Sequence, residues 1–415
     1  MLVLSLFSAL LAWNLYHPWH GRPSALSLLS FIAGMMGELL GLYLIAFQAT
    51  VALLWVWLCG LEGFADALGL AVHFGAWVAI GLFYWRGQSA RDDIEQGITQ
   101  ALGEHYRDEI PASRGAAIPE LLKVEQALKP FKMKPADVTV HKDIVYGTAE
   151  GHSLKLDIYH HRDRPENAPV LFQIHGGGWM EKMGDKNQQA LPLMYQLASH
   201  GWVCVSVDYR LSPSFRWPAH IQDCKSALIW TKEHIAEYGG DADFVVATGG
   251  SAGGHLSALL ALSPNDAAFQ PDNTEADTSV QGLVTIYGVH DFTNSRNQRL
   301  HEDLDKVLAE KIIGLPAMGN EELYQQASPL YRVTEQAPPT LIVHGGSDTL
   351  VPVAESRCLY EAFREKNVDA VGYAEIRDAQ HAFELLPTPR CQHTVNGIER
   401  FVTVLHERYL KQKAQ

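Results

Sequence analysis

Two glycine-rich segments of the 415-residue chain combine the residue types that acyl-transfer chemistry requires. Residues 249–254 read GGSAGG and follow the apolar run 244–247, so Ser251 is expected at a sharp turn between a strand and a helix. Residues 175–179 read HGGGW and follow the apolar run 170–174, which predicts backbone N–H groups free to bind an oxyanion. Their order, about 75 residues apart, fits a serine nucleophile with its oxyanion hole. Neither segment carries the Gly-Lys-Ser/Thr ending of a nucleotide-binding loop.

A serine nucleophile needs a base to take its proton and an acid to orient that base. The expected chain order after such a turn is serine, acid, histidine. We therefore assign Ser251 as nucleophile, Asp348 as the acid on the loop after an apolar strand, and His381 as the base after the last predicted strand. Asp291 and Asp378 are the alternative acids, and both also suit a turn-forming role. Four further histidines are expected to brace loops, line the pocket or pack in the interior: His175, His255, His290 and His344.

The backbone N–H groups of Gly176, Gly177 and Ala252 are the predicted oxyanion donors. One donor of this kind typically contributes about 3 kcal/mol to transition-state stabilisation. Trp179 ends the glycine segment, and two roles remain open for it: lining the substrate pocket or packing beneath the loop.

Strand and helix patterns alternate through residues 139–415, the expected catalytic domain. Two runs, Thr139–Tyr146 and Ser153–Ile158, suggest an antiparallel pair around Gly151. Later apolar runs are separated by amphipathic helices, which predicts an α/β fold with a mostly parallel, doubly wound sheet and helices on both faces. Catalytic residues then belong on loops at the carboxyl ends of the strands.

The first 86 residues are almost free of charge and are predicted to form a membrane-spanning helical region. Gly41–Gly60 and Ala67–Trp85 each approach the about 20 residues that one span needs. With residues 1–16 and 24–37, three or four spans are expected. The alternative is a buried helical subdomain that covers the catalytic domain.

Residues 87–138 are polar and proline-punctuated, which predicts a helical linker that includes a candidate lid. Arg22, Arg86 and Arg91 are the basic residues near the predicted spans, and they weakly favour a multi-pass membrane protein with its catalytic domain in the cytoplasm. The net charge of −14 argues against nucleic acid as a partner. No cysteine or histidine spacing suggests a metal site.

The chain resembles the hormone-sensitive-lipase-like esterases over about residues 140–410. HGGGW, the DYRLSP of residues 208–213, GGSAGG, the Asp348 loop and the His381 loop occur in that family's order. The resemblance is closest to mycobacterial-type membrane-anchored carboxylesterases, and the chain is also similar to isoprenylcysteine methylesterases and arylformamidases. It implies an α/β-hydrolase fold, no cofactor, and hydrolysis of short- to medium-chain acyl esters. One departure is Gly250, because the common pattern has Asp before the serine.

The predicted function is therefore hydrolysis of a small-molecule or lipid carboxylic ester by a serine nucleophile. Membrane lipid is the other expected partner of the chain. Two alternatives remain: amide hydrolysis or acyl transfer on the same residues, and a membrane-anchored binding module without activity. The sequence does not indicate an oligomeric state.

Overall fold

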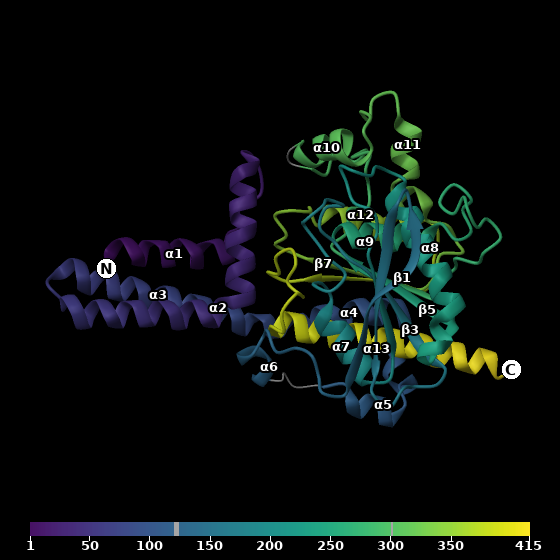
Figure 1. Ribbon diagram of the computed structural model, residues 1–415. Coiled ribbons are helices and arrows are strands. Elements are labelled where there is room, and N and C mark those ends of the chain that lie inside the picture. Colours follow the sequence, from purple (N-terminus) through teal and green to yellow (C-terminus); the bar gives the residue numbers. More distant parts are fainter. Residues whose placement is uncertain (120–123, 300–301) are drawn as a thin grey trace.

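The computed structural model describes residues 1–119, 124–299 and 302–415, which form an α/β domain and an N-terminal helical extension (Figure 1). Residues 120–123 of the predicted linker lie outside the described residues. The eight strands of the domain are β1 (Val138–Ala149), β2 (His152–His161), β3 (Ala168–Ile174), β4 (Val203–Val207), β5 (Gly240–Gly250), β6 (Gly282–Ile286), β7 (Thr340–Gly345) and β8 (Val371–Ile376).

These strands form one sheet in the order β1-β2-β4-β3-β5-β6-β7-β8. Strand β2 pairs antiparallel with both β1 and β4, and every later pair is parallel. The predicted hairpin and the mostly parallel sheet are both confirmed. Because the central strands run the same way, the loops after β3, β5, β6, β7 and β8 leave the sheet at one edge.

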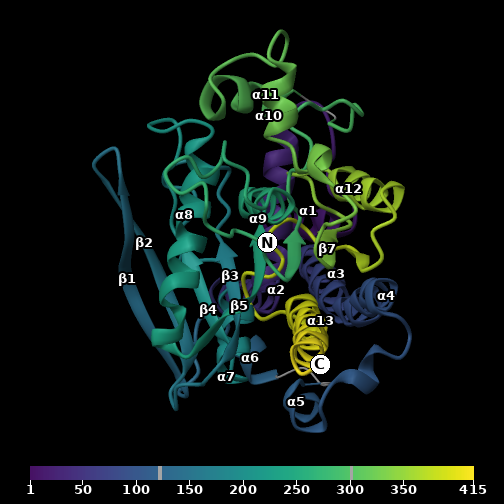
Figure 2. The same ribbon diagram turned by 90° about the vertical axis from the view of Figure 1, so that its right-hand side faces the viewer.

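Helices cover both faces of the sheet (Figure 2). The helices of the domain are α4 (Ala90–Leu102), α5 (Ala112–Ala117), α6 (Val124–Leu128), α7 (Leu191–Ser199), α8 (Ala219–His234), α9 (Ala252–Leu262), α10 (Asp303–Val307), α11 (Glu321–Gln326), α12 (Ala354–Glu365) and α13 (Pro389–Lys413).

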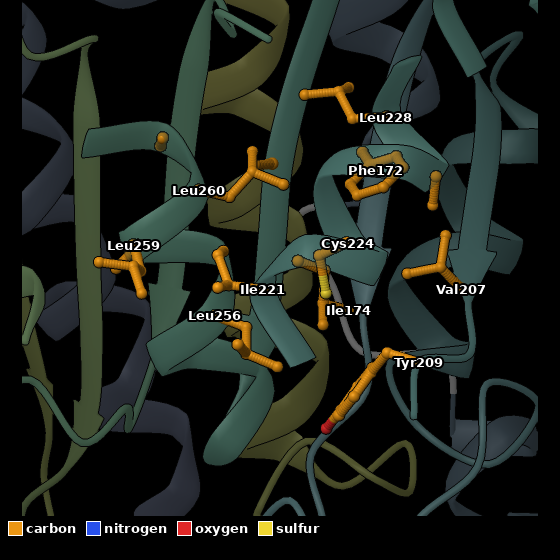
Figure 3. Close-up of a cluster of buried hydrophobic side chains, with 14 of the residues drawn as sticks. Phe172, Ile174, Val207, Tyr209, Ile221, Cys224, Leu228, Leu256, Leu259 and Leu260 are labelled. Atoms are coloured by element: carbon orange, nitrogen blue, oxygen red, sulfur yellow. The ribbon is translucent and has the colours of Figure 1, made fainter. Parts of the chain in front are cut away.

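Alternate residues of each central strand enter two separate cores, as strand geometry requires. Phe172 and Ile174 of β3 point to the face of α8 and α9, where they pack with Leu228 and Leu256 (Figure 3). Leu171, between them in sequence, belongs to the core under α4, α7 and α13. Both faces of the sheet are therefore covered by helices. Functional side chains are expected on the loops at the strand ends.

Helix α4, within the predicted linker, packs closely against the sheet. Ile94 and Ile98 are fully buried, and a methyl group on Gly97 would lie only 3.0 Å from the β-carbon of Ala374 on β8. Asp93 also accepts a hydrogen bond from the backbone N–H of Arg377 at 2.9 Å. The helix packs beside α13 and against the edge strand β8, so residues 90–102 of the predicted linker form part of the domain core in this structure.

Three helices form the N-terminal extension: α1 (Leu2–Tyr16), α2 (Ser24–Cys59) and α3 (Phe64–Arg86). Helix α2 bends at Leu40, whose φ of −123° and ψ of 16° are not helical. Its first half stands against the α/β domain, whereas its second half runs outward beside α1 and α3 (Figure 1).

Two helical stretches among the described residues are long and apolar enough to cross a membrane: Ser24–Cys59 and Phe64–Leu102, which contains α3. Helix α1, with 15 residues, is shorter. The expected count of three or four spans thus reduces to two candidates, because residues 24–37 and 41–59 belong to one helix.

Candidate active site

The nucleophile candidate occupies a strained turn between β5 and α9. Ser251 has a φ of 59° and a ψ of −122°, a conformation that costs a non-glycine residue free energy. Its N–H donates to the carbonyl of Ile286 at 3.0 Å, and its own carbonyl accepts from His255 N–H at 3.0 Å. A methyl group on Gly253 would overlap the carbonyl oxygen of Ile174, so the close approach of β3 to α9 requires glycine there.

Tyr287 explains the departure at Gly250. A β-carbon at Gly250 would lie 2.8 Å from the Tyr287 hydroxyl oxygen, closer than real β-carbons come. The ring of Tyr287 also packs against the His381 imidazole, with centroids 4.4 Å apart. Tyr287 thus fills the space that an aspartate side chain would need, and it contacts both the serine turn and the base loop.

His381 and Asp348 form a buried hydrogen-bonded pair, as the sequence predicts. His381 Nδ1 lies 2.6 Å from Asp348 Oδ2, and the two side chains are 4% and 0% exposed. The other carboxylate oxygen, Oδ1, accepts the backbone N–H groups of Leu350 and Val351, each at 2.8 Å. The carboxylate is therefore held from both ends, which leaves Nε2 of His381 as the atom able to accept a proton.

Two opposing effects determine the ionisation of Asp348. Burial alone would raise the pKa of this carboxyl, but the charge of the His381 imidazole and hydrogen bonds from His344 and His381 outweigh burial. The net effect lowers the pKa of Asp348 well below its usual range. The carboxylate therefore stays ionised while it orients the base.

The three predicted oxyanion donors differ in availability. The N–H of Gly176 donates to Gln189 Oε1 at 2.6 Å, so it is occupied. Gly177 has a φ of +109°, and neither its N–H nor that of Ala252 hydrogen bonds to another described residue. Gly177 and Ala252 are the free donors beside the serine turn, and Gln189 is a residue that no motif indicates.

Residues of the DYRLSP segment hold the glycine loop in place. Tyr209 donates its hydroxyl to the carbonyl of His175 at 2.9 Å, and the two rings stack 4.5 Å apart. Ser212 N–H donates to the Trp179 carbonyl at 2.8 Å. His175 contacts the glycine loop itself, because its Nδ1 lies 2.7 Å from the Gly176 carbonyl oxygen. Of the roles expected for this histidine, the contact fits loop support.

Trp179 packs beneath the glycine loop. It is 2% exposed, and its indole N–H donates to His255 Nδ1 at 3.2 Å. His255 Nε2 lies 2.7 Å from the carbonyl of Ala327, so the ring is neutral with its proton on Nε2. Burial lowers the pKa of His255 to about 4, which agrees with that state. Of the two roles left open for Trp179, the geometry favours packing.

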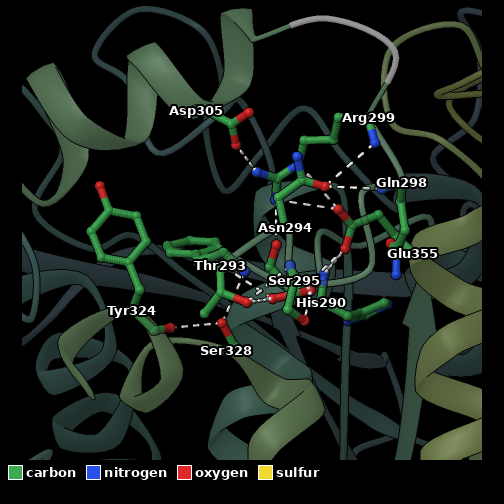
Figure 4. A network of polar contacts seen from close by, with 12 residues as sticks. His290, Thr293, Asn294, Ser295, Gln298, Arg299, Asp305, Tyr324, Ser328 and Glu355 are labelled. Carbon is green, nitrogen blue, oxygen red and sulfur yellow. Dashed lines mark hydrogen bonds and ion pairs between the residues drawn. The ribbon is translucent and has the colours of Figure 1, made fainter. Parts of the chain in front are cut away.

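The alternative acids serve other purposes. Asp291 accepts hydrogen bonds from Thr293 N–H at 2.9 Å and Ser295 N–H at 3.0 Å, which is a turn-forming role. The surrounding loop is held by Glu355, which accepts the N–H groups of His290 and Asp291, each at 2.9 Å (Figure 4).

Asp378 points to cations rather than to the base. Its carboxylate pairs with Arg86 at 2.9 Å and lies 3.9 Å from Arg390. His344 lies 3.3 Å from Asp348 and bonds Ser356 Oγ at 2.7 Å, so it supports the acid from within the core. Within the described residues, no three histidine, cysteine or acidic side chains gather as a metal site would require.

The strand order and the glycine-flanked serine turn define the α/β-hydrolase fold. The BD-FAE family model matches residues 156–363, half of the chain. The chain therefore belongs to the BD-FAE family of hormone-sensitive-lipase-like esterases, and it is a carboxylic ester hydrolase.

Relatives in Mycobacterium tuberculosis agree with that assignment. LipM, described as a probable carboxylic ester hydrolase, is 46% identical over 266 residues, 64% of this chain and 61% of LipM. Esterase LipQ is 39% identical over 78% of this chain and 77% of its own length. Esterase LipC is 34% identical over 82% of this chain and 86% of its own length.

Solved structures share the fold. A truncated carbohydrate esterase from gut microbiota superposes with a TM-score of 0.55 at 22% identity, covering 66% of this chain and 98% of that one. Esterase 2 of Thermogutta terrifontis, phosphonylated by sarin, gives a TM-score of 0.51 at 25% identity. The match covers 60% of this chain and 87% of that one.

Proposed function

We propose that this esterase hydrolyses its substrates through a Ser251–His381–Asp348 triad and an acyl-enzyme intermediate. The observation that carries the proposal is the buried 2.6 Å contact between His381 Nδ1 and Asp348, on the same sheet edge as the strained Ser251 turn. In this mechanism Ser251 Oγ attacks the ester carbonyl while His381 Nε2 takes its proton. His381 then protonates the leaving alcohol and activates the water that releases the acid.

The developing oxyanion is stabilised by the N–H groups of Gly177 and Ala252, which are free of other partners among the described residues. The predicted third donor, Gly176, contributes only after its bond to Gln189 opens. A site that binds the oxyanion with fixed backbone dipoles needs no reorganisation when charge develops.

The proposed substrates are short- to medium-chain acyl esters, including esters that partition into membranes. Large apolar side chains beyond the bend at Leu40 support contact with lipid, since Phe47, Trp57 and Phe64 are 67%, 80% and 81% exposed. Helix α3 and the second half of α2 supply the proposed membrane-inserted hairpin. Arg86 and Arg91 at its end favour a cytoplasmic catalytic domain.

Ser251→Ala tests the chemistry. We expect the variant to fold and to lose turnover of p-nitrophenyl butyrate and labelling by a fluorophosphonate probe. Ser257→Ala is the matched control, because Ser257 is buried on α9, the helix that follows Ser251, and its hydroxyl donates to the Gly254 carbonyl at 3.2 Å. A folded Ser251→Ala enzyme with ester turnover contradicts the proposal. Acyl transfer to added alcohols in preference to water would instead indicate a transferase.

Acyl esters of increasing chain length, assayed in detergent and in liposomes, test the substrate class. We expect liposomes to favour the longer, membrane-partitioned esters. Equal rates in both media at every chain length contradict the lipid part of the proposal while leaving the esterase chemistry intact.

A further inference from the structure

Glu38 is a buried carboxylate in an otherwise uncharged helix. It is the one charged residue of α2, and it is 2% exposed. A buried carboxylate costs several kcal/mol unless it is paired and hydrogen-bonded. Glu38 meets both conditions: Oε1 lies 3.3 Å from Arg390 Nη1, and Oε2 accepts the backbone N–H of Gln380 at 2.9 Å. The single charged side chain of α2 therefore binds the backbone of Gln380, the residue next to His381.

Gln380 connects the loop of the proposed base with the loop of the proposed acid. Its side-chain oxygen accepts the N–H of Thr349 at 2.8 Å and the N–H of His381 at 2.9 Å. Thr349 follows Asp348 in the chain, so one amide oxygen binds a neighbour of each triad member. Since Glu38 holds the backbone of Gln380, it also holds this connection in register.

Arg390 anchors the other end of Glu38. Its guanidinium lies over the Phe83 ring at 4.3 Å, and its Nε donates to the carbonyl of Arg377 at 3.0 Å. Arg390 is 2% exposed. One buried cation thus joins α2, α3 and the loop that leads from β8 to His381.

The same face of α2 touches the catalytic loops at three further positions. Ser27, Phe31, Gly34 and Glu38 are spaced three or four residues apart, which places them on one side of a helix. The Phe31 ring meets His381 edge-on at 5.9 Å, and the Ser27 carbonyl lies 3.3 Å from Thr349 Oγ1. At Gly34 a β-carbon would lie 3.1 Å from the Gln380 amide nitrogen, so the helix and the loop are in close contact.

We propose that Glu38 is a positioning residue for catalysis: it holds Gln380, and through Gln380 the His381 and Asp348 loops, in their reactive arrangement. The first half of α2 is then part of the catalytic apparatus, while the second half serves the membrane. This inference rests on the proposed triad. It assigns a chemical purpose to the one charge in α2, which an anchoring role does not need.

Glu38→Leu and Glu38→Gln in the full-length chain test the inference, with Glu62→Gln as control because Glu62 lies in the exposed loop between α2 and α3. Leucine removes the acceptor for Gln380 N–H. Glutamine keeps an acceptor oxygen but loses the charge pair with Arg390. We expect kcat to fall about tenfold to a hundredfold for leucine, because small displacements of catalytic groups have effects of that size. KM should change little, and glutamine should recover part of kcat.

The pH profile of kcat/KM separates positioning from general stability. We expect the profile to shift in Glu38→Gln, because the histidine loop moves relative to Asp348, while Glu62→Gln keeps the parent profile. If Glu38→Leu does not fold, Glu38→Gln decides the question. An unchanged kcat and an unchanged pH profile in both folded variants, or in folded Glu38→Gln where Glu38→Leu does not fold, overturn the inference while the triad stands. Full activity of Ser251→Ala overturns the triad itself, so the two failures are distinguishable.

Discussion

Asp348→Asn is the sharpest test of the proposed acid, because the structure dictates how the new amide must orient. Asp348 Oδ1 accepts two backbone N–H groups at 2.8 Å, from Leu350 and Val351. The asparagine oxygen must take that place, since an NH₂ group there would face two donors. The NH₂ group then faces His381 Nδ1, 2.6 Å from Oδ2 in the parent protein.

An amide donor at that position forces His381 Nδ1 to act as an acceptor, so the proton moves to Nε2. A histidine protonated on Nε2 cannot accept the proton of Ser251. We expect kcat for p-nitrophenyl butyrate to fall by about 10³–10⁴, the loss that a wrong tautomer causes in serine proteases. This factor corresponds to about 4–5.5 kcal/mol of activation free energy. The expected change in folding stability is smaller, because the substitution keeps the side-chain shape and both backbone bonds.

Asp291→Asn is the control for this prediction. Asp291 is also buried and also follows a strand, but its carboxylate bonds the turn at Thr293 and Ser295 rather than a histidine. We expect its kcat to remain within a few-fold of the parent enzyme. Equal losses in the two variants, or less than a tenfold loss in Asp348→Asn, would refute the assignment of the acid.

Three further predictions follow from the packing around the site. Gly250→Ala should lower kcat by pushing Tyr287 towards His381, with a destabilisation of about 1–3 kcal/mol typical of overpacking; unchanged kinetics and melting temperature would contradict it. Trp179→Phe should lower the urea midpoint, since it leaves the buried His255 Nδ1 without its donor, but should leave acyl-chain preference unchanged; altered preference would mean that Trp179 lines the pocket. The unfolding free energy should fall as pH drops from 6.5 towards 4, because the unfolded chain protonates the His255 side chain in this range and the folded chain does not. The loss of unfolding free energy approaches about 1.4 kcal/mol per pH unit for this one site. Urea titrations at several pH values check it.

Much of the fold and of the candidate site can be predicted from short sequence patterns. The strands around Val170–Ile174 and Phe244–Ala247 are continuous apolar runs because both faces of the sheet are covered, and that pattern is visible in sequence. Motif, order and loop position are enough to predict Ser251, Asp348 and His381 as the candidate triad. The contact between His381 and Asp348 joins residues that the β7 and β8 strands bring together, so topology was enough to predict it.

Other features depend on tertiary contacts that carry no local signal. Gln189 reaches Gly176 from a loop with no motif. Helix α4 looks polar in sequence, yet its small and branched residues at 94, 97 and 98 are buried against β8 and α13. The role of Glu38 was unreadable for the same reason, because its partners lie more than 340 residues away along the chain.

The bend at Leu40 bears on where this enzyme can be cut. A boundary drawn from hydropathy removes everything before residue 87 as an anchor. That cut also discards Phe31, which packs against His381, and Glu38, which accepts the backbone N–H of Gln380. A soluble version that begins within the first helical half of α2 and bypasses residues 41–86 with a short linker would keep those contacts. Under the proposed role of Glu38, the boundary between the catalytic part and the apolar hairpin lies at the bend in α2, and a shortened variant is best divided there.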